Sequence, residues 1–373
     1  MRIKRVLALL LMKAMQVFPI NRKKVFFSSY QGTAYNSFPR LVSEKIHIVG
    51  GYVIVWAINS KDAVPDYVKT VKPESIGEMF HLATSKYWVD NCRKYIWVRK
   101  RKQQMYFQTW HGSVCLKVVE KDAVTLDDYY VKRAINDSRM ANYILSQCKW
   151  RTNNIINSFW YDGNIIEGDT EPFDETTIIQ SKERVYKHYH LENDDNLILY
   201  APTFRNGNDL SPYNLNFSAL VLSFMERFGG RWKVIFRLHP NIAFLFDSIK
   251  QQGNVINGNS YEMMEDLIAA TDVLISDYSS CIFSGFKARK RVFLYTPDLD
   301  KYTSDERSLY FDITKLPSPL AMNQNELEEK VRLFDEDSYY RAVDSFNNYL
   351  GYFDNDGINE ICEIICKDKR RSK

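Results

Sequence analysis

Short apolar runs rich in β-branched and aromatic residues recur along this chain, and stretches with helical spacing separate them. Six runs lie in the first half, at residues 25–27, 52–56, 87–89, 105–107, 143–145 and 164–166. Five more follow, at residues 197–200, 234–236, 255–256, 273–275 and 292–295. Continuous apolar runs of this kind are typical of parallel strands that are buried on both faces and joined by helices. The pattern therefore predicts an α/β protein with two parallel sheets.

A polar stretch near residues 169–187 interrupts the alternation. The chain of 373 residues is also longer than one hydrophobic core usually supports. We expect two Rossmann-like, doubly wound domains that face each other across a cleft. The N-terminal segment, the first domain and the second domain are assigned to residues 1–24, 25–185 and 186–373. Helical spacing in the second domain covers residues 218–228, 261–270 and 326–349. The sequence beyond residue 351 could form a helix that packs back on the first domain.

Positive charge gathers at the start of the chain, although the formal net charge is only +4. The first acidic residue is Glu44, and eight lysines and arginines precede it. Further basic clusters lie at residues 93–102 and 367–373. Such clusters favour anionic partners, namely lipid headgroups, phosphate-bearing substrates or nucleic acid. The alternative is that the later two clusters are ordinary solvated faces.

Residues 2–18 have the spacing of a basic amphipathic helix, with apolar side chains on one arc and basic or polar side chains opposite. The uninterrupted apolar run, residues 6–12, is far shorter than the roughly 20 residues that span a bilayer. We expect this helix to lie on an anionic membrane surface. One alternative is a signal peptide, but no small-residue cleavage site follows. The other is a helix packed on the protein's own core.

Six cysteines are dispersed along the chain without CxxC pairs or metal-ligand spacing. A disulfide framework is therefore not expected, and the chain suits a reducing cytoplasm. The sequence also lacks a GxGxxG fingerprint, a Walker loop, an HExxH helix and a GxSxG elbow. We expect no metal and no cofactor.

Polar residues suited to phosphate chemistry follow four of the predicted strands. These segments are residues 108–112 (QTWHG), 201–205 (APTFR), 237–241 (RLHPN) and 276–280 (SDYSS). In parallel sheets, ligands bind beyond the carboxyl ends of the strands, where loops expose backbone amides and helix N-termini. The four segments are therefore the candidate active site.

The two histidines of these segments each have a chemical and a plain interpretation. His111 could deprotonate an attacking hydroxyl, although a lone histidine after a strand is more often structural. Gly112 after it permits close backbone approach or simply makes a turn. His239 lies between Arg237 and Pro240, which suggests a rigid loop that presents hydrogen-bond donors to a diphosphate.

Three further residues also have both a chemical and a plain interpretation. Arg205 suits bidentate contact with phosphate, and a surface ion pair is its plain interpretation. Ser279 and Ser280 could bind an anion at the start of the next helix, or could simply cap that helix.

Taken in order and with their spacing, these segments resemble the CDP-glycerol glycerophosphotransferase family, which includes the teichoic acid primases and polymerases of Gram-positive bacteria and related capsule enzymes. Residues 108–112, followed by Leu116 and Lys117, are the most recognisable signature. The other similar elements are residues 29–39, 200–205, 237–240, 276–280 and 317–319, with Tyr302, Arg307 and Tyr310. The resemblance covers most of the chain.

The resemblance implies a GT-B architecture whose second domain binds a CDP-activated donor. It also implies transfer of a polyol phosphate, most commonly glycerol phosphate, to a hydroxyl of an undecaprenyl-linked acceptor, with release of CMP. Such an enzyme would be a peripheral protein on the cytoplasmic face of the cell membrane, and would use cationic side chains in place of a metal.

The resemblance also implies roles for individual residues. His111 and His239 would be catalytic, with His111 as the base. The implied substrate-binding residues are Gly112, Thr203, Arg205, Arg237, Asn241, Asp277, Ser279, Ser280 and Arg307.

Several alternatives stay open from the sequence. The donor could carry ribitol phosphate or another polyol phosphate instead of glycerol phosphate. A GT-B sugar transferase or a nucleotide-sugar epimerase would share the fold, and a membrane-bound relative could keep the fold without activity. A nucleic-acid binder is disfavoured because the basic clusters lack interleaved aromatic platforms.

Overall fold

The computed structural model describes residues 2–60, 64–124, 126–170, 173–205, 210–249, 255–305 and 308–371. The chain divides into two compact units. Unit 1 comprises Met1–Ser113, Val119–Thr170 and Gly351–Lys373. Unit 2 comprises Val114–Val118 and Glu171–Leu350.

Over the described residues, unit 1 is built on a seven-stranded parallel sheet with the order β3-β2-β1-β4-β5-β6-β7. Its strands are β1 (Asn21–Ser28), β2 (Val53–Ala57), β3 (Lys69–Val71), β4 (Ser85–Asp90), β5 (Met105–Gln108), β6 (Tyr143–Ser146) and β7 (Asn164–Glu167). Its helices are α1 (Arg2–Met15), α2 (Ser37–Val49), α3 (Ile76–Thr84), α4 (Asp128–Met140), α5 (Lys149–Ser158) and α13 (Gly357–Arg371).

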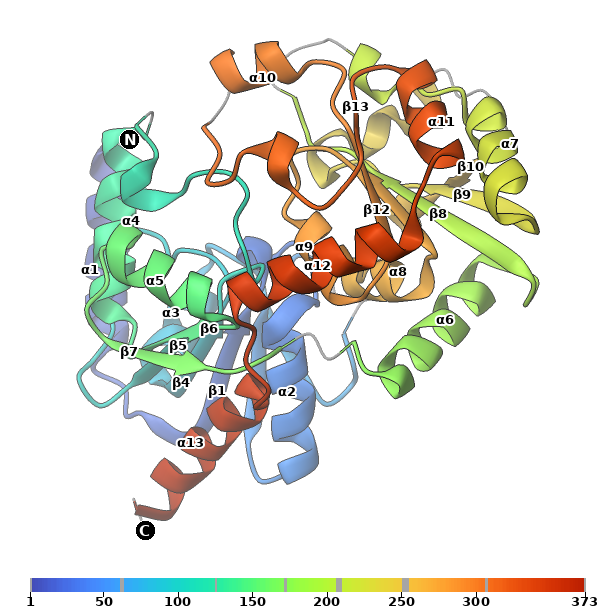
Figure 1. Ribbon diagram of the computed structural model, residues 1–373. Helices are drawn as coiled ribbons and strands as arrows, with labels where there is room; N and C mark the ends of the chain where they lie inside the picture. The colour runs from blue at the N-terminus through green and yellow to red at the C-terminus, as the bar shows by residue number, and fades with distance from the viewer. Residues whose placement is uncertain are drawn as a thin grey trace. The chain divides into compact units, whose positions relative to one another are not determined.

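Both faces of this sheet are buried. Side chains along a strand point alternately to opposite faces, so neighbouring residues of one strand belong to different core clusters. Phe27 and Trp56 lie in a core cluster with residues of α2 and α13. Phe26 and Trp88 belong to a second cluster with residues of α1, α3 and α5. Figure 1 shows α2 and α13 side by side on one face. This two-sided burial explains why the strands read as continuous apolar runs.

Unit 2 contains a six-stranded parallel sheet in its described residues, with the order β10-β9-β8-β11-β12-β13. Its strands are β8 (Asp195–Ala201), β9 (Arg231–Phe236), β10 (Val255–Asn257), β11 (Val273–Ser276), β12 (Arg291–Tyr295) and β13 (Leu320–Ala321). Its helices are α6 (Glu175–Tyr189), α7 (Phe217–Phe228), α8 (Met264–Ala270), α9 (Cys281–Lys287), α10 (Leu299–Asp305), α11 (Gln324–Arg332) and α12 (Glu336–Leu350). Helices α7 and α11 pack together, as do α6 and α8 (Figure 1).

All eleven apolar runs seen in the sequence form strands. The sequence did not predict β3 and β13, which have three and two residues and lie at sheet edges. The helix expected at residues 326–349 is two helices, α11 and α12. The buried Phe334 separates them, and Asp335 accepts a hydrogen bond from the Ser338 N–H at 3.1 Å to start α12.

Unit 2 begins earlier than the expected boundary at residue 186. Helix α6 arises from the polar stretch of the sequence, and Asp174 caps it by accepting a hydrogen bond from the Thr177 N–H at 2.7 Å. Arg184 of α6 pairs with Asp266 of α8 at 2.7 Å. These contacts place α6 within unit 2.

The end of the chain lies within unit 1. Ile361 and Ile365 of α13 are fully buried in the cluster of α2, and the Tyr87 hydroxyl of β4 donates a hydrogen bond to Asp368 at 2.9 Å. The segment before α13 is fixed to β6 and β7, because the Phe353 N–H donates to the Gln147 carbonyl at 3.1 Å and the Asp169 N–H donates to the Asn355 carbonyl at 2.7 Å.

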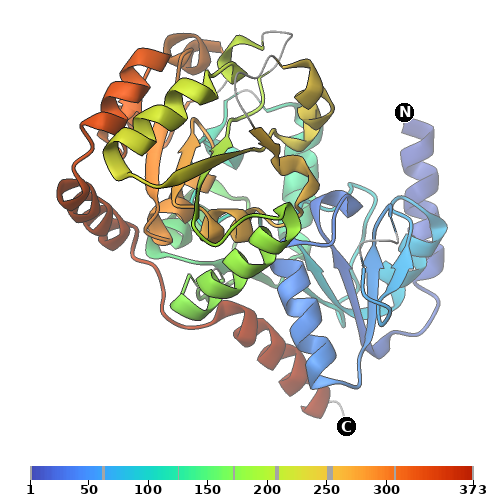
Figure 2. The ribbon, with the colours of Figure 1, turned by 90° about the vertical axis from the view of Figure 1, so that its right-hand side faces the viewer.

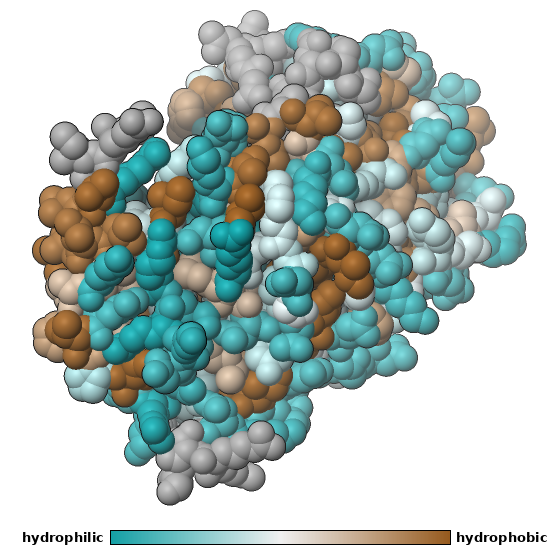
Figure 3. Space-filling model, turned by 90° about the vertical axis from the view of Figure 1, so that its left-hand side faces the viewer, coloured by the Kyte–Doolittle hydropathy of each residue, from teal (hydrophilic) through white to brown (hydrophobic). Residues whose placement is uncertain are grey.

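Helix α1 forms at the expected place and lies on the outside of unit 1 (Figure 2). One side of it packs on α3, where Met12 is fully buried and Leu11 and Met15 are partly buried. Val6, Leu7 and Leu10 are more than half exposed. The space-filling view of this side of the molecule shows apolar patches among hydrophilic ones (Figure 3). The helix therefore combines an inner face packed on the core with an exposed apolar face.

Candidate active site

The predicted site residues of unit 2 follow three adjacent strands. Strand β8 lies between β9 and β11, so the loops after these strands meet at one edge of the sheet. Thr203 and Arg205 follow β8, Arg237 to Asn241 follow β9, and Asp277 to Ser280 follow β11. The shared edge is the arrangement that the sequence predicted for these loops.

Asp277 joins the loops after β8 and β11. Its two carboxylate oxygens accept hydrogen bonds from the Thr203 N–H at 2.8 and 3.0 Å, and it also accepts from the Tyr278 N–H at 2.6 Å. Arg205 pairs with the same carboxylate at 2.8 Å. Asp277 is thus occupied by groups of its own unit.

Arg205 is buried between two carboxylates. Its Nε donates to Asp298 at 2.8 Å, opposite the contact with Asp277. Burial lowers the pKa of Arg205, but the two carboxylates outweigh this effect, and the net pKa shift is upward. The guanidinium also lies 5.0 and 5.1 Å from the rings of Tyr278 and Tyr302, which stack on each other at 3.6 Å. These contacts suit Arg205 to positioning the loops rather than to contacting phosphate.

Asp298 was not identified from the sequence. It follows β12, which lies beside β11, so its position after a strand end was available as a signal. Nothing local to Asp298 reveals its pairing with an arginine 93 residues earlier.

His239 lies exposed at the carboxyl end of β9. Its Nδ1 accepts a hydrogen bond from the Asn241 N–H at 3.2 Å, at the start of the 3₁₀ segment Pro240–Ser248. The neutral ring must then carry its proton on Nε2. Protein atoms packed around part of the ring lower the pKa of His239, and the positive charge of Lys117 lowers it further. The histidine is therefore set to donate a hydrogen bond from Nε2.

Lys117 lies in the short segment Val114–Val118 of unit 2, which pairs with residues 308–310 in antiparallel fashion. The Tyr310 N–H donates to the Leu116 carbonyl at 2.8 Å, and the Val118 N–H donates to the Ser308 carbonyl at 3.0 Å. The Lys117 ammonium lies 5.6 Å from the Tyr302 ring. Lys117 belongs to the signature seen in the sequence, but it was not among the predicted site residues.

Three other predicted residues differ in their surroundings. Arg237 donates to the backbone carbonyls of Gly258 at 2.9 Å and Glu262 at 3.2 Å, so its guanidinium supports the neighbouring turn. The Ser279 hydroxyl accepts a hydrogen bond from the Cys281 N–H at 3.4 Å. Ser280 is exposed, and its side chain makes no capping bond to α9.

The Thr203 hydroxyl is buried and has no hydrogen-bond partner among the described residues. A buried hydroxyl without a partner is costly, so this atom is suited to a ligand. The predicted site residue Arg307 lies outside the described residues. Within the described part of the chain, no group of three or more His, Cys, Asp or Glu residues could hold a metal ion.

In unit 1, His111 lies exposed in the loop after β5. Its Nδ1 lies 2.8 Å from the Asn91 carbonyl oxygen, which can only accept, so Nδ1 carries the proton of the neutral ring and Nε2 is free to accept one. Displacement of water by nearby protein atoms lowers the pKa of His111, against the opposing effect of the Asn91 carbonyl, and Arg151 and Arg93 lower it further. The neutral, proton-accepting form is therefore favoured.

The loop that carries His111 is a tight turn. Trp110 has a φ of 57°, and Gly112 has a φ of 126°, a region that favours glycine. The Gln108 side chain accepts a hydrogen bond from the Trp110 N–H at 2.9 Å, and the Trp110 ring stacks on the imidazole at 4.8 Å. Gly112 is therefore a turn residue, which was its plain interpretation. Its proposed contact with substrate stays a prediction.

The basic cluster at residues 93–102 is largely engaged within unit 1. Arg93 is buried and pairs with Glu120 at 2.6 Å and with Asp137 at 3.1 Å. Arg101 donates to the carbonyl of Gln16 at 2.8 Å, at the end of α1. The structure favours a structural role over an anion-binding one for these two arginines.

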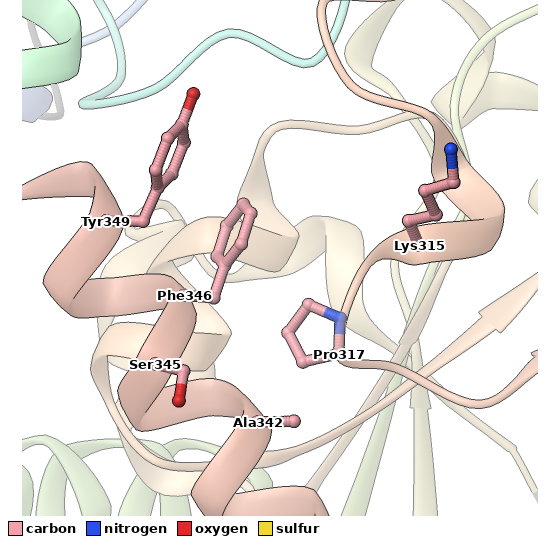
Figure 4. A pocket seen from close by; sticks show the side chains of 6 residues that line it. All are labelled: Lys315, Pro317, Ala342, Ser345, Phe346 and Tyr349. Carbon is pink, nitrogen blue, oxygen red and sulfur yellow. The ribbon is translucent and has the colours of Figure 1, made fainter.

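A surface hollow in unit 2 lies apart from the predicted residues (Figure 4). The rings of Phe346 and Tyr349 project from α12, and Lys315 and Pro317 come from the chain before β13. None of the predicted site residues lines this hollow.

The family model for CDP-glycerol:poly(glycerophosphate) glycerophosphotransferases matches residues 10–367. The chain belongs to this family. The match includes both units and all four strand-end segments, and it confirms the resemblance inferred from the sequence.

Curated relatives of this glycerophosphotransferase family member include a teichoic acid poly(glycerol phosphate) polymerase of Bacillus subtilis. It is 27% identical over 354 residues, which cover 90% of this chain and 47% of that protein. The chain thus spans about half the length of that relative. A teichoic acid glycerol-phosphate transferase of Staphylococcus aureus is 24% identical over 371 residues, covering 93% of this chain and 94% of that protein.

Among solved structures, the family member is similar to a variant of the wall teichoic acid polymerase TagF. The TM-score is 0.85 at 22% identity, over 99% of this chain and 96% of that chain. This likeness concerns the fold, and it confirms the predicted GT-B-like α/β architecture with two parallel sheets. Over the described residues, the family member has no helix long and apolar enough to cross a membrane.

Proposed function

We propose that the protein transfers a polyol phosphate, most simply glycerol phosphate, from a CDP-activated donor to a hydroxyl of a lipid-linked acceptor. The observation that carries this proposal is the family match over residues 10–367. The relatives from B. subtilis and S. aureus are named for glycerol phosphate polymerisation and transfer in teichoic acid synthesis, which supports the same cargo here.

Unit 2 would bind the donor at the carboxyl ends of β8, β9 and β11. The Nε2–H of His239 is suited to donate to a phosphate oxygen, and the hydroxyls of Thr203 and Ser280 can add further donors. Arg205 and Arg237 would act indirectly, because their guanidinium groups are bound to carboxylates and carbonyls of unit 2. Asp277 would likewise hold the loops in place.

His111 of unit 1 would act as the general base. The acceptor hydroxyl would lose its proton to Nε2 of His111 while its oxygen attacks the β-phosphorus of the donor. The bond between that phosphorus and the oxygen bridging to the α-phosphate would break, and CMP would leave with the bonding electrons. The hydrogen bond from Nδ1 to the Asn91 carbonyl would stabilise the imidazolium that forms.

Helix α1 would hold the enzyme on the cytoplasmic face of the membrane. Its exposed apolar residues Val6, Leu7 and Leu10 support this role, together with the basic residues around them in the sequence. A peripheral position would bring the protein to lipid-linked acceptors.

A donor panel tests the proposed reaction. Purified protein with a lipid-linked acceptor should release CMP from CDP-glycerol or CDP-ribitol, and the UDP-sugars of the panel should not react. Turnover of a UDP-sugar alone would indicate a sugar transferase or an epimerase. If the folded protein binds the donor but releases no CMP from any CDP-polyol, it is a non-catalytic relative.

A further inference from the structure

Asn91 is a fully buried residue directly after β4, the strand that lies between β1 and β5. Its polar groups contact both neighbouring loops. The carbonyl accepts from Nδ1 of His111 at 2.8 Å, and the side-chain Oδ1 accepts from the Tyr30 N–H at 2.8 Å. The side-chain Nδ2 donates to the Ser29 hydroxyl at 3.1 Å, which donates in turn to Asn36 at 3.0 Å. One residue thus links the loop after β1 to the imidazole.

The loop after β1 has an unfavourable backbone. Tyr30, Gln31 and Gly32 are consecutive residues with φ values of 45°, 56° and 85°. Each non-glycine residue in this region costs on the order of 1 kcal/mol or more, and such strain persists only where surrounding contacts impose it. The hydrogen bond from the Tyr30 N–H to Asn91 is one of these contacts.

Two features show what the strained turn achieves. The Tyr30 ring lies 5.9 Å from the His111 ring. A Cβ atom added to Gly32 would lie 2.2 Å from Cγ of Pro73, so the turn is also packed closely on its outer side. Asn91 therefore contacts both the imidazole and the backbone of Tyr30, whose ring lies next to that imidazole.

We propose that Asn91 is the positioning residue of His111. Its carbonyl selects the Nδ1–H tautomer, and its side chain holds the strained turn that places Tyr30 beside the imidazole. The catalytic part of this proposal rests on the proposed function, in which His111 is the base. The structural part, the tautomer and its dependence on Asn91, does not require activity.

Three charged side chains have the largest electrostatic effects on His111. Arg151 and Arg93 raise the positive potential at the ring, and Glu120 opposes them. Arg93 is itself paired with Glu120 and Asp137. A new carboxylate at position 91 would therefore change the local charge in the direction that stabilises imidazolium.

The test uses Asn91→Asp and Asn91→Ala in the full chain. Asn91→Asp keeps the acceptor for the Tyr30 N–H, and its charge should raise the pKa of His111 by about one unit. Asn91→Ala keeps the backbone carbonyl that accepts from His111 but removes the side-chain hydrogen bonds to Tyr30 and Ser29. It should lower kcat about 10- to 100-fold through misplacement of the strained turn and of the imidazole beside it, with an unchanged KM for CDP-glycerol. Imidazole ¹⁵N shifts should report Nδ1–H in the wild type, and a pH titration should show the shift in Asn91→Asp.

Asn142→Asp is the matched control. Its Oδ1 also accepts a backbone hydrogen bond, from the Tyr106 N–H at 2.9 Å, but at the amino end of the same sheet. It should leave the titration of His111 unchanged. If Asn91→Ala does not fold, Ser29→Ala, which removes the acceptor of the Asn91 amide, should give the smaller loss of kcat.

The outcomes separate the two proposals. An Nε2–H tautomer in the wild type, or an unchanged His111 titration in Asn91→Asp, would overturn the positioning role whatever the activity. Normal turnover by His111→Ala would instead overturn the proposed base, and the ¹⁵N data would still decide the role of Asn91.

Discussion

The two site histidines carry their protons on opposite ring nitrogens. His111 donates from Nδ1 to a carbonyl, which leaves Nε2 as an acceptor, whereas His239 accepts at Nδ1 and presents Nε2–H. One imidazole is therefore suited to take a proton and the other to donate a hydrogen bond. The sequence grouped both as catalytic, and only their backbone partners distinguish them.

Turnover should depend on pH through His111. The pKa of His111 is lowered from 6.5, so its neutral form persists below that pH and is lost as pH falls through the lowered value. We expect the ascending limb of the kcat/KM profile for CMP release to have its midpoint below 6.5. His111→Ala should lower kcat about 10²- to 10⁴-fold. A midpoint at or above the ordinary histidine value would contradict this prediction.

Unit 2 should be sensitive to loss of Asp298. The substitution Asp298→Ala would leave the buried Arg205 with one carboxylate and two unpaired N–H donors, and leaving a buried donor unpaired costs about 1–3 kcal/mol. Chemical denaturation, followed by a probe in unit 2, should show this loss of stability. Asp247→Ala, at an exposed position of unit 2, should leave the midpoint nearly unchanged. Equal stability of the two variants would argue against a stabilising ion pair between Arg205 and Asp298.

Helix α1 has separable inner and outer faces. Leu7→Glu and Leu10→Glu alter side chains that are 56% and 57% exposed, so they should weaken binding to anionic vesicles roughly tenfold without lowering stability. Vesicle sedimentation measures the binding. Ile48→Glu is the matched control, because Ile48 is an exposed apolar residue of α2 in the same unit. A similar loss of vesicle binding in the control would contradict a specific role of α1 in membrane binding.

Most elements could be predicted because burial on both faces gives strands an unbroken apolar signal. Strands β3 and β13 are too short for such a signal, and they depend on pairing with β2 and β12. Helix α6 was not predicted because its polar outer face makes the segment look like a polar linker in the sequence. Residues at strand ends were found because parallel strands share an edge, whereas Asn91 and Asp298 were missed because partners distant in sequence define their roles.

Each unit of the molecule depends on chain segments that are distant in sequence. Truncation after residue 350 would remove Ile358, Ile361 and Ile365 from the core of unit 1. Loss of one such buried side chain usually costs about 2–5 kcal/mol. We expect unit 1 to unfold, while unit 2 should still be protected by CDP-glycerol in limited proteolysis. Lys367→Ala, at an exposed position of α13, should behave as the wild type.

The return of α13 to unit 1 has a consequence for synthesis on the ribosome. Strands β1 to β7 are synthesised before the main segment of unit 2, but helix α13, which covers one face of their sheet together with α2, is synthesised after it. During translation of residues 171–350, Phe27, Trp56 and Leu145 therefore lack part of their final cover. The nascent protein must keep this apolar surface from aggregating until residues 357–371 have left the exit tunnel. The main segment of unit 2 is continuous, so unit 2 can fold before unit 1 is completed by α13.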